Sequence, residues 1–493
     1  MKSKIRVRFA PSPTGFLHIG GLRSALYDQL FARHHGGDFI LRIEDTDTAR
    51  TVKDGIENIC LSLKACGVIP NEGVWMDEQG KVIERGDCGP YIQTKRQKKH
   101  LAYAEELIKK DKAYYCFCSS ERLTKLREEQ TKSGMPPRYD GRCRELPKEE
   151  VAARLAKGEE HVIRLKLPTS GKIKFSDVIR GDVEFDWSAM DDQVIIKSSG
   201  LPTYHLASTC DDHDMAITHV LRGEEWLPST PKHLFIYQAF GWKPPEFAHL
   251  PLLLNADRSK LSKRQGDVSV AEILGKGYLT EALVNFVALL GWNPTADLEI
   301  YQPYELAKLF DLTKVNKAGA VVNYEKLDWL NAGYIKALPE EEYLAKVRPQ
   351  IKTKIKDAEF IKRCLQLVRE RVVKLNDVPA LTDFFFQTEL DYSRVSLGWK
   401  KQPKSEIVER LEALKDLLSG TKEADALKVE VVENKIKKLI EERGWSNGDT
   451  LWPLRVALSG QEKSPSPFEL LAAYGKERAL ARLTDALNYL IER

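Results

Sequence analysis

Residues 5–21 read I-R-V-R-F-A-P-S-P-T-G-F-L-H-I-G-G, and they decide the fold that this sequence predicts. Ile5, Val7 and Phe9 alternate with arginines, which is the pattern of a β-strand. The P-S-P-T-G segment at 11–15 then breaks the strand, because proline and glycine favour turns. A strand that ends in a tight turn therefore opens the fold.

A helix and a second strand follow this turn. The helical repeat runs through Leu22, Ala25, Leu26, Gln29 and Leu30 and stops at Gly36 and Gly37. The run F-I-L-R-I at 39–43 is the next strand. Strands that alternate with helices predict a parallel sheet, whose ligand site lies beyond the carboxyl ends of its strands. Both the 11–15 loop and the acidic segment 44–47 would lie at that edge.

The composition limits the class of protein. The chain has 493 residues, 42% hydrophobic and 30% charged, with 76 Lys and Arg against 72 Asp and Glu. These values are typical of a globular protein, which at about 150 residues per domain has two to four domains, and they exclude disordered and collagen-like classes. The apolar run at 282–290 is about half as long as a membrane span, and the N-terminus lacks a secretory signal. We therefore expect a cytoplasmic protein with no membrane role and with reduced cysteines.

The helix start after the turn suits a phosphate group. Glycines such as Gly20 let a phosphate chain approach the backbone, and a helix N-terminus favours its negative charge. His18 could donate a hydrogen bond to a phosphate oxygen in a transition state. By itself, such a histidine is more often a helix cap or a surface residue, so the flanking residues must decide.

Those flanking residues resemble a known family. The 11–21 segment is similar to the first signature of the class I aminoacyl-tRNA synthetases, and K-L-S-K-R at 260–264 is similar to the second. Alone, the second segment would be interpreted as a solvated basic loop. Further similar segments are R-I-E-D-T-D at 42, Y-D-G-R-C-R at 139, P-T-Y-H at 202, R-G-E-E-W at 222 and Y-G-K-E-R-A-L-A-R-L at 474. They extend the resemblance over nearly the whole chain and indicate the bacterial-type glutamyl-tRNA synthetases within the class.

The resemblance implies an α/β fold, a Rossmann-like catalytic domain with an insert, followed by an all-α anticodon-binding region. We expect the first half of the catalytic domain at 1–95, an inserted acceptor-end binding domain at 96–203, the second half at 204–255, a stem-contact region with the K-L-S-K-R loop at 256–335 and the helical anticodon-binding domain at 336–493. In that last domain Arg363, Arg369 and Arg371 could contact phosphates, and Trp452 or Phe468 could stack on bases. For each of these residues taken singly, a structural role is the better interpretation: a solvated position for the arginines and a core position for Trp452 and Phe468. No anticodon-reading residue is therefore named.

The implied activity is ATP-dependent activation of L-glutamate to glutamyl-adenylate, followed by transfer to the terminal ribose of tRNA(Glu). Glutamate carries two carboxylates and one ammonium group, so its pocket needs cationic donors and an acidic or polar acceptor. Arg8 and Arg222 suit the carboxylates, and Glu44 suits the amine. The family's glutamate-site positions match Arg8, Ser12, Glu44, Tyr204 and Arg222. Without the resemblance, an ordinary ion pair between Arg8 and Glu44 on adjacent strands would be favoured.

The same resemblance implies the ATP site and its chemistry. The ATP-binding residues would be His18, Gly20, Gly21, Glu225, Lys260, Ser262 and Lys263, and the tRNA acceptor end would meet Thr46 and Asp47. His18, Lys260 and Lys263 would be catalytic, because they can stabilise the charge on a departing pyrophosphate. The reaction needs no side-chain nucleophile. Mg²⁺ is expected with the ATP phosphates, although no motif identifies its ligands.

Cys116, Cys118 and Cys143 form a third feature. Three thiols suit zinc, but a closed structural site needs four ligands and no fourth Cys or His is near. Some members of the resembling family bind zinc here. Their fourth ligand is a tyrosine, which matches Tyr139, or a histidine at a position that is Glu145 in this chain. Zinc held with Tyr139 and three buried or idle thiols both remain open.

Two other functions fit parts of the sequence. Glutaminyl enzymes generally show a P-E-P-N-G-type loop and a β-barrel tail, whereas this chain reads A-P-S-P-T-G and has a helical tail pattern. A non-catalytic, synthetase-derived RNA-binding protein would have no need of the phosphate-loop residues. The expected partners are therefore tRNA(Glu), L-glutamate and ATP, and the chain is expected to be a monomer.

Overall fold

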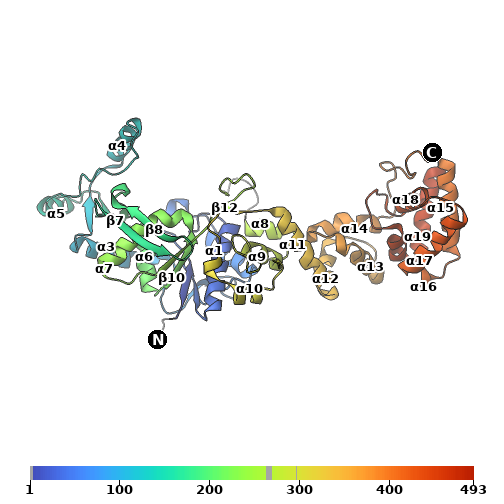
Figure 1. The fold of residues 1–493 in the computed structure, drawn as a ribbon, viewed down its shortest axis with the longest axis horizontal. Helices are drawn as coiled ribbons and strands as arrows, with labels where there is room; N and C mark the ends of the chain where they lie inside the picture. The colour runs from blue at the N-terminus through green and yellow to red at the C-terminus, as the bar shows by residue number, and fades with distance from the viewer. Residues whose placement is uncertain (1–3, 262–268, 296, 493) are drawn as a thin grey trace. The chain divides into compact units, whose positions relative to one another are not determined.

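The computed structural model describes residues 4–261, 269–295 and 297–492. The chain forms two compact units. The first comprises Met1–Leu274 and Thr280–Tyr324, and the second comprises Gly275–Leu279 and Glu325–Arg493. In Figure 1 the first unit runs from blue to yellow, and residues 325–492 of the second run from dark yellow to red.

The N-terminal sheet of the first unit confirms the strand, helix, strand prediction. It has the order β1 (Arg6–Phe9), β2 (Asp38–Leu41), β3 (Glu72–Met76) and β4 (Val82–Arg85), with α1 (Ile19–His34) and α2 (Gly55–Ala65) between its strands. β1, β2 and β3 are parallel, with Arg8 opposite Ile40, and β4 is antiparallel. Val7, Phe39 and Ile40 are fully buried, so the sheet contributes directly to the core.

A second four-stranded sheet lies beside the first. Its order is β10 (His219–Gly223), β11 (Glu246–Leu250), β7 (Lys172–Asp177) and β8 (Gly181–Asp186), with α6 (Tyr204–Asp214) and α7 (Thr230–Phe240) packed against each other next to it. The backbone N–H of Thr218 donates to the carbonyl of Arg6, 2.9 Å away, which joins β10 to β1. The carboxyl ends of β1, β2 and β10 therefore meet at one edge.

Two segments of this region combine different elements. T-Y-H-L-A-S-T-C at 203–210 forms the N-cap and first turns of α6, in which Leu206, Ala207 and Cys210 are buried. D-V-I-R-G-D-V-E-F at 177–185 contains the turn between β7 and β8, which form an antiparallel hairpin.

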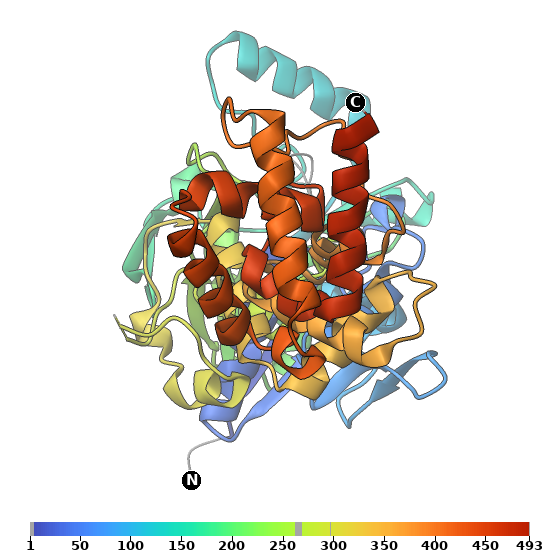
Figure 2. The same cartoon turned by 90° about the vertical axis from the view of Figure 1, so that its right-hand side faces the viewer.

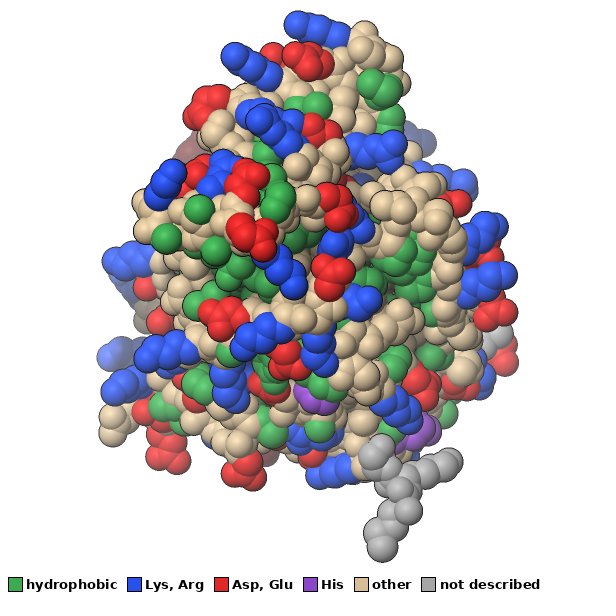
Figure 3. All heavy atoms as spheres, turned by 90° about the vertical axis from the view of Figure 1, so that its left-hand side faces the viewer, with side chains coloured by type: hydrophobic (Ala, Val, Ile, Leu, Met, Phe, Trp, Pro, Cys, Tyr) green, Lys and Arg blue, Asp and Glu red, His purple; other side chains and the backbone are tan. Residues whose placement is uncertain are grey.

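A third sheet, with three helices near it in the chain, lies inside the span expected as an insert. It comprises β5 (Ala113–Cys116), β6 (Val162–Leu165) and β9 (Val194–Ile196), and the helices are α3 (Gln97–Lys109), α4 (Ser120–Lys132) and α5 (Lys148–Ala156). Acidic and basic side chains intermingle on the face seen in Figure 3. The hairpin at 172–186 falls within the same span yet pairs with β11 of the second sheet. The five domain boundaries themselves stay predictions.

The rest of the first unit packs under α1. It contains β12 (Leu253–Leu254), β13 (Ala320–Val321), α8 (Val270–Gly275), α9 (Thr280–Ala288) and α10 (Pro303–Leu309). Tyr27 Oη on α1 donates to the carbonyls of Ala288, at 3.0 Å, and Leu290, at 3.1 Å. Arg23, also on α1, donates to the carbonyl of Pro251. Arg23 and Tyr27, four residues apart on α1, thus attach this helix to the segments around Pro251 and Leu290.

The second unit confirms the prediction of a helical tail. Its helices are α11 (Tyr324–Ala337), α12 (Glu340–Val347), α13 (Ala358–Val368), α14 (Val378–Phe386), α15 (Lys404–Ser419), α16 (Glu423–Ala426), α17 (Val429–Glu442), α18 (Asn447–Ser459) and α19 (Pro467–Glu492). Figure 2 shows the helices of 404–492 packed side by side. No strand occurs at 275–279 or 325–492, the part of this unit that the structure describes. A β-barrel tail of the glutaminyl type is therefore absent from these residues.

Side chains proposed for RNA contact in this unit mostly serve the fold. Arg363 Nε donates to the carbonyl of Ala473 at 3.2 Å, and Arg369 donates to three carbonyls near the end of α11. Phe468 is buried in the core, and Trp452 Nε1 donates to the Ser396 carbonyl at 3.0 Å. Phe468 therefore has the core position weighed in the sequence, whereas Arg363, Arg369 and Trp452 are half-buried and hydrogen-bonded to backbone carbonyls. Among the described residues, no helix is long and apolar enough to cross a membrane.

Asp28 on α1 is a buried acid without a hydrogen-bond partner. Its side chain is fully buried, and neither carboxylate oxygen has a partner among the described residues. Burial raises the pKa of Asp28 well above its ordinary value, although Arg8 opposes the shift. The folded chain therefore holds this proton to a higher pH than the unfolded chain does. The stability that this proton contributes is complete below the unfolded pKa and is lost as the pH rises through the folded pKa.

We therefore predict that Asp28→Asn stabilises the protein at pH 8, because it removes the cost of ionising or desolvating this carboxyl. The gain should be about 1–3 kcal/mol and should shrink at pH 4, because the carboxyl of the unfolded chain, with an ordinary pKa of 3.8, is already partly protonated there. Thermal unfolding at the two pH values measures it. Asp54→Asn, at an exposed position, is the control and should change stability by less than about 0.5 kcal/mol. An Asp28→Asn chain no more stable than wild type at pH 8 would contradict the prediction.

Candidate active site

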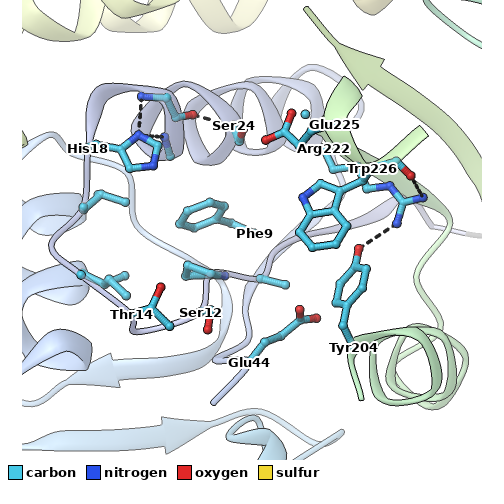
Figure 4. Close-up of a pocket in the computed structure, with 18 of the residues that line it drawn as sticks. Phe9, Ser12, Thr14, His18, Ser24, Glu44, Tyr204, Arg222, Glu225 and Trp226 are labelled. Carbon is cyan, nitrogen blue, oxygen red and sulfur yellow. Dashed lines mark hydrogen bonds between the residues drawn. The ribbon is translucent and has the colours of Figure 1, made fainter. Parts of the chain in front are cut away.

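A cavity of about 690 Å³ opens at the carboxyl ends of β1, β2 and β10. The sequence-predicted residues that line it are Arg8, Ser12, His18, Gly20, Gly21, Glu44, Thr46, Asp47, Tyr204, Arg222, Glu225 and Lys260. In Figure 4, His18 lies on the opposite side of the cavity from Tyr204 and Arg222, with Phe9 between them. The predicted Ser262 and Lys263 lie outside the residues that the structure describes.

His18 begins the helix at one end of the cavity. It is the N-cap of α1, and its Nδ1 accepts the backbone N–H groups of Gly20, at 3.1 Å, and Gly21, at 3.2 Å. Because Nδ1 is an acceptor, the proton of the neutral ring is on Nε2, which makes Nε2 a donor. The two interpretations of His18, helix cap and phosphate donor, are therefore compatible, since each uses a different ring nitrogen.

The two glycines allow this cap. A Cβ atom at Gly20 would lie 3.0 Å from His18 Nδ1, and one at Gly21 would lie 2.8 Å from Leu17 Cδ1. Any larger side chain would therefore displace the imidazole or the leucine beneath it. The glycines keep the helix N-terminus open to a ligand, where its partial positive charge favours anions.

Arg8 and Glu44 do not form the direct ion pair considered from the sequence. Arg8 Nε donates to Asp212 Oδ1 at 2.9 Å. Arg42 donates to the same oxygen at 2.7 Å and to Glu44 Oε1 at 3.0 Å. Burial raises the pKa of Glu44, although Arg42 and Arg8 oppose the rise. Asp212 and Arg42 therefore connect the two predicted substrate residues. Reasoning from the sequence missed this link, for which its only signal was the acidic pair at 211–212.

Arg222 completes the end of the cavity opposite His18. Its Nη1 donates to Tyr204 Oη at 2.8 Å, and its Nε donates to His249 Nε2 at 3.0 Å. Trp226 packs on Tyr204 with ring centroids 4.2 Å apart. This end of the cavity thus carries two buried guanidinium groups and one carboxyl, which suits a small ligand with more negative than positive charge.

The K-L-S-K-R loop returns to the cavity at both of its described flanks. Lys260 pairs with Leu254 in a β-bridge, and Ser269 pairs with His18 in another. Lys260 is exposed and lines the cavity. On the other wall, Lys197, which directly follows β9, donates to the carbonyl of Thr46 at 2.9 Å, a contact that the sequence did not indicate.

Comparisons with known proteins decide the family. Residues 4–329 match the catalytic-domain model of the class I tRNA synthetases (E and Q), and residues 341–487 match an anticodon binding domain model. A glutamate–tRNA ligase of Chloroherpeton thalassium is 43% identical over 99% of this chain and 98% of its own length. The chain belongs to the glutamate–tRNA ligase family.

Other ligases of this family agree over the same length. The ligase of Finegoldia magna is 43% identical over 99% of this chain and all of its own. The crystal structure of a glutamate tRNA ligase from Elizabethkingia meningosepticum, in complex with its amino acid, has a TM-score of 0.87 and 37% identity over 99% of this chain and 100% of that one. The resemblance seen in the motifs is confirmed, and the chain is an aminoacyl-tRNA ligase with a class I catalytic domain, which implies ATP.

This ligase also brings its three spaced thiols together. The sulfur atoms of Cys116, Cys118 and Cys143 all lie within 4.8 Å of one another. Tyr139 Oη lies 3.4 Å from Cys116 Sγ and 3.6 Å from Cys118 Sγ. Burial raises the pKa of the Cys118 thiol to about 11, whereas hydrogen bonds from Tyr139 and Arg164 outweigh burial and lower the pKa of Cys116. Three sulfurs lie close together and one phenol oxygen lies near two of them, so the cluster could hold zinc.

Proposed function

We propose that this ligase activates L-glutamate with ATP in the cavity described above and transfers the glutamyl group to the terminal ribose of tRNA(Glu). The observation that carries the proposal is the shared cavity. One end has two guanidinium groups and an acid, and the other has a capped helix N-terminus and a lysine. The family relatives, one of them solved with its amino acid, support this assignment.

The end beside Asp212 suits the amino acid. Arg8 and Arg222 would bind the two carboxylates, and Glu44 would accept a hydrogen bond from the ammonium group, with Ser12 and Tyr204 lining the same wall. Among the described residues, the side chain of Arg8 donates a hydrogen bond only through its Nε, to Asp212 Oδ1. Its terminal nitrogens are therefore the donors that a substrate carboxylate would meet. The α-carboxylate would then face the centre of the cavity, where ATP must present its α-phosphate.

The end beside His18 suits ATP. His18 Nε2 would donate to a phosphate oxygen while Gly20 and Gly21 let the phosphates approach the helix, and Lys260 with Lys263 and Ser262 would stabilise the departing pyrophosphate. Glu225 would contact the nucleoside, and Mg²⁺ would accompany the phosphates. Thr46 and Asp47, on the wall that Lys197 supports, would meet the tRNA acceptor end. Catalysis would then rest on positioning and charge stabilisation.

Charging tests the proposal directly. Purified tRNA(Glu) and tRNA(Gln) are incubated with the protein, labelled glutamate and ATP, and acid-stable label on each tRNA is counted. We expect tRNA(Glu) to be charged and labelled glutamine to give no product. Charging of tRNA(Gln) as well would mean that an amidotransferase must act on the product. Charging of neither would leave the non-catalytic, RNA-binding alternative.

A second prediction separates the two roles of His18. His18→Asn keeps a good N-cap but cannot reach a phosphate from the second ring nitrogen. We expect turnover to fall about 100-fold or more while the KM for glutamate and the thermal midpoint stay nearly unchanged. His18→Ala is the comparison, because it should lose both the activity and about 1 kcal/mol of stability. If His18→Asn kept full turnover, His18 would have only the capping role.

We also propose that the thiol cluster binds one structural zinc through Cys116, Cys118, Cys143 and Tyr139. The zinc would join β5 and the start of α4 to the segment around Cys143. No other set of three or more closely spaced His, Cys, Asp or Glu ligands occurs in the described residues. The ion would supply folding energy to this region and would take no part in the chemistry.

Metal analysis by mass spectrometry after dialysis tests the zinc proposal. The wild-type chain should retain about one zinc per molecule, Cys143→Ser should lose it, and Tyr139→Phe should bind it more weakly. Cys364→Ser, at a buried thiol in the second unit, is the control and should keep its zinc. A wild-type chain without zinc would leave three idle thiols as the correct interpretation.

The remaining expectations follow from this function. A ligase that supplies translation acts in the cytoplasm, and we propose that location here. One chain contains the whole cavity, so we propose that it works as a monomer.

A further inference from the structure

Arg222 lies in a cage of neutral acceptors. All five of its N–H groups are directed at protein atoms: Nε at His249 Nε2, Nη1 at Tyr204 Oη and His233 Nδ1, and Nη2 at Thr230 Oγ1 and the Trp226 carbonyl, at 2.8–3.4 Å. Its side chain is buried, and no carboxylate of the described residues lies within ion-pair distance of it. Arg8, in contrast, is paired with Asp212. The orientation of Arg222 thus depends on neutral groups.

The protonation of His249 decides whether it can take part in this cage. Its Nε2 accepts from Arg222 Nε at 3.0 Å and lies 3.2 Å from the Thr230 hydroxyl, so Nε2 must carry a lone pair. Its Nδ1 lies 2.6 Å from Asp177 Oδ2, so the ring proton is on Nδ1 and is donated to that carboxylate. Burial lowers the pKa of His249, although Asp177 opposes this, which keeps the ring neutral.

Asp177 is itself held in one orientation. It is fully buried at the end of β7, and its Oδ1 accepts the backbone N–H groups of Ile179, at 3.0 Å, and Arg180, at 2.8 Å. Its Oδ2 is the atom that faces His249 Nδ1. The turn after β7 therefore fixes Asp177, Asp177 fixes the tautomer of His249, and His249 orients the guanidinium of Arg222.

We propose that Asp177 and His249 are positioning residues for glutamate recognition, which act through Arg222 and touch no substrate themselves. This inference rests on the proposed function, in which Arg222 binds a glutamate carboxylate. Because the cage is neutral, the charge of Arg222 is not compensated. All five N–H groups already have protein acceptors, so a substrate carboxylate must replace one of them, and the longest contact is that of Nη2 with the Trp226 carbonyl at 3.4 Å. Because the histidine tautomer is fixed, the guanidinium keeps one direction.

Asp177→Asn is the sharpest test because it changes the hydrogen bonding at one atom, Oδ2. This oxygen faces His249 Nδ1 at 2.6 Å and also accepts the backbone N–H of His249 at 3.2 Å, an N–H that keeps its second acceptor, Oδ1, at 3.3 Å. The two N–H groups of the turn keep the amide oxygen at the Oδ1 position, so the amide nitrogen faces His249 Nδ1. His249 must then carry its proton on Nε2. Two hydrogen-bond donors, the Nε2–H of His249 and the Nε–H of Arg222, then point at each other. We expect the KM for glutamate to rise about 10- to 100-fold, with the KM for ATP and the turnover at saturating glutamate changed less than about threefold. Steady-state charging of tRNA(Glu) measures all three.

A double-mutant cycle separates this route from a structural effect. His249→Gln places an amide oxygen near the position of Nε2 and has no tautomer to control, so it should keep a KM near wild type. In that background Asp177→Asn should add little. Asp182→Asn, an exposed acid on the paired strand β8, is the matched control and should behave as wild type.

Each outcome decides the inference. It is overturned if Asp177→Asn has the glutamate KM of the control, or if its effect is as large in the His249→Gln background. If thermal unfolding shows that Asp177→Asn does not fold, His249→Leu takes its place: it removes the acceptor and should raise the glutamate KM, and equal KM values for His249→Leu and His249→Gln would overturn the inference. A wild-type chain that charges no tRNA would refute the proposed function, and this inference with it, before any variant is compared.

Discussion

The carboxylate of Asp212 is the contact on which the active-site end of the molecule depends. It accepts hydrogen bonds from Arg8 on β1 and from Arg42 just after β2, while Asp212 itself belongs to α6. Three elements far apart in the chain are thereby joined in a buried, charged contact. Removing one partner of such a contact leaves an uncompensated charge in the interior, which costs several kcal/mol. The positions of Arg8 and Glu44 in the cavity follow from this constraint.

The two arginines of the cavity are held by opposite means. Arg8 has a carboxylate partner, so its charge is largely compensated before any substrate arrives. Arg222 is oriented by two imidazoles, two hydroxyls and a carbonyl, which leave its charge uncompensated. A dicarboxylate with one ammonium group would meet both arginines and Glu44. The same neutral cage would give an amide less electrostatic stabilisation than a carboxylate, which agrees with membership of the glutamate rather than the glutamine branch of the family.

Much of the fold was predictable because its signals are local. The alternation at 5–9, the break at 11–15 and the helical repeat from Leu22 gave β1, α1 and β2 in their observed order. The periodicity of the tail gave helices, since Leu411, Leu414 and Leu418 share the buried face of α15. Pairing between distant segments was not predictable. The hairpin at 172–186 pairs with β11, about seventy residues later in the chain, and this pairing leaves no local pattern in the sequence.

The sequence alone was enough to indicate the family and several of the residues that line the cavity, because they belong to short motifs that occur in a fixed order. His18 with its glycines, Arg8, Glu44 and Arg222 could be named from their neighbours in the chain. Only the tertiary structure decided how these residues are held. Asp212, His249, Asp177 and Lys197 act through directed hydrogen bonds to groups up to 204 positions away. Hydrogen bonds depend on distance and angle in space, and neither quantity is encoded in residue spacing along the chain.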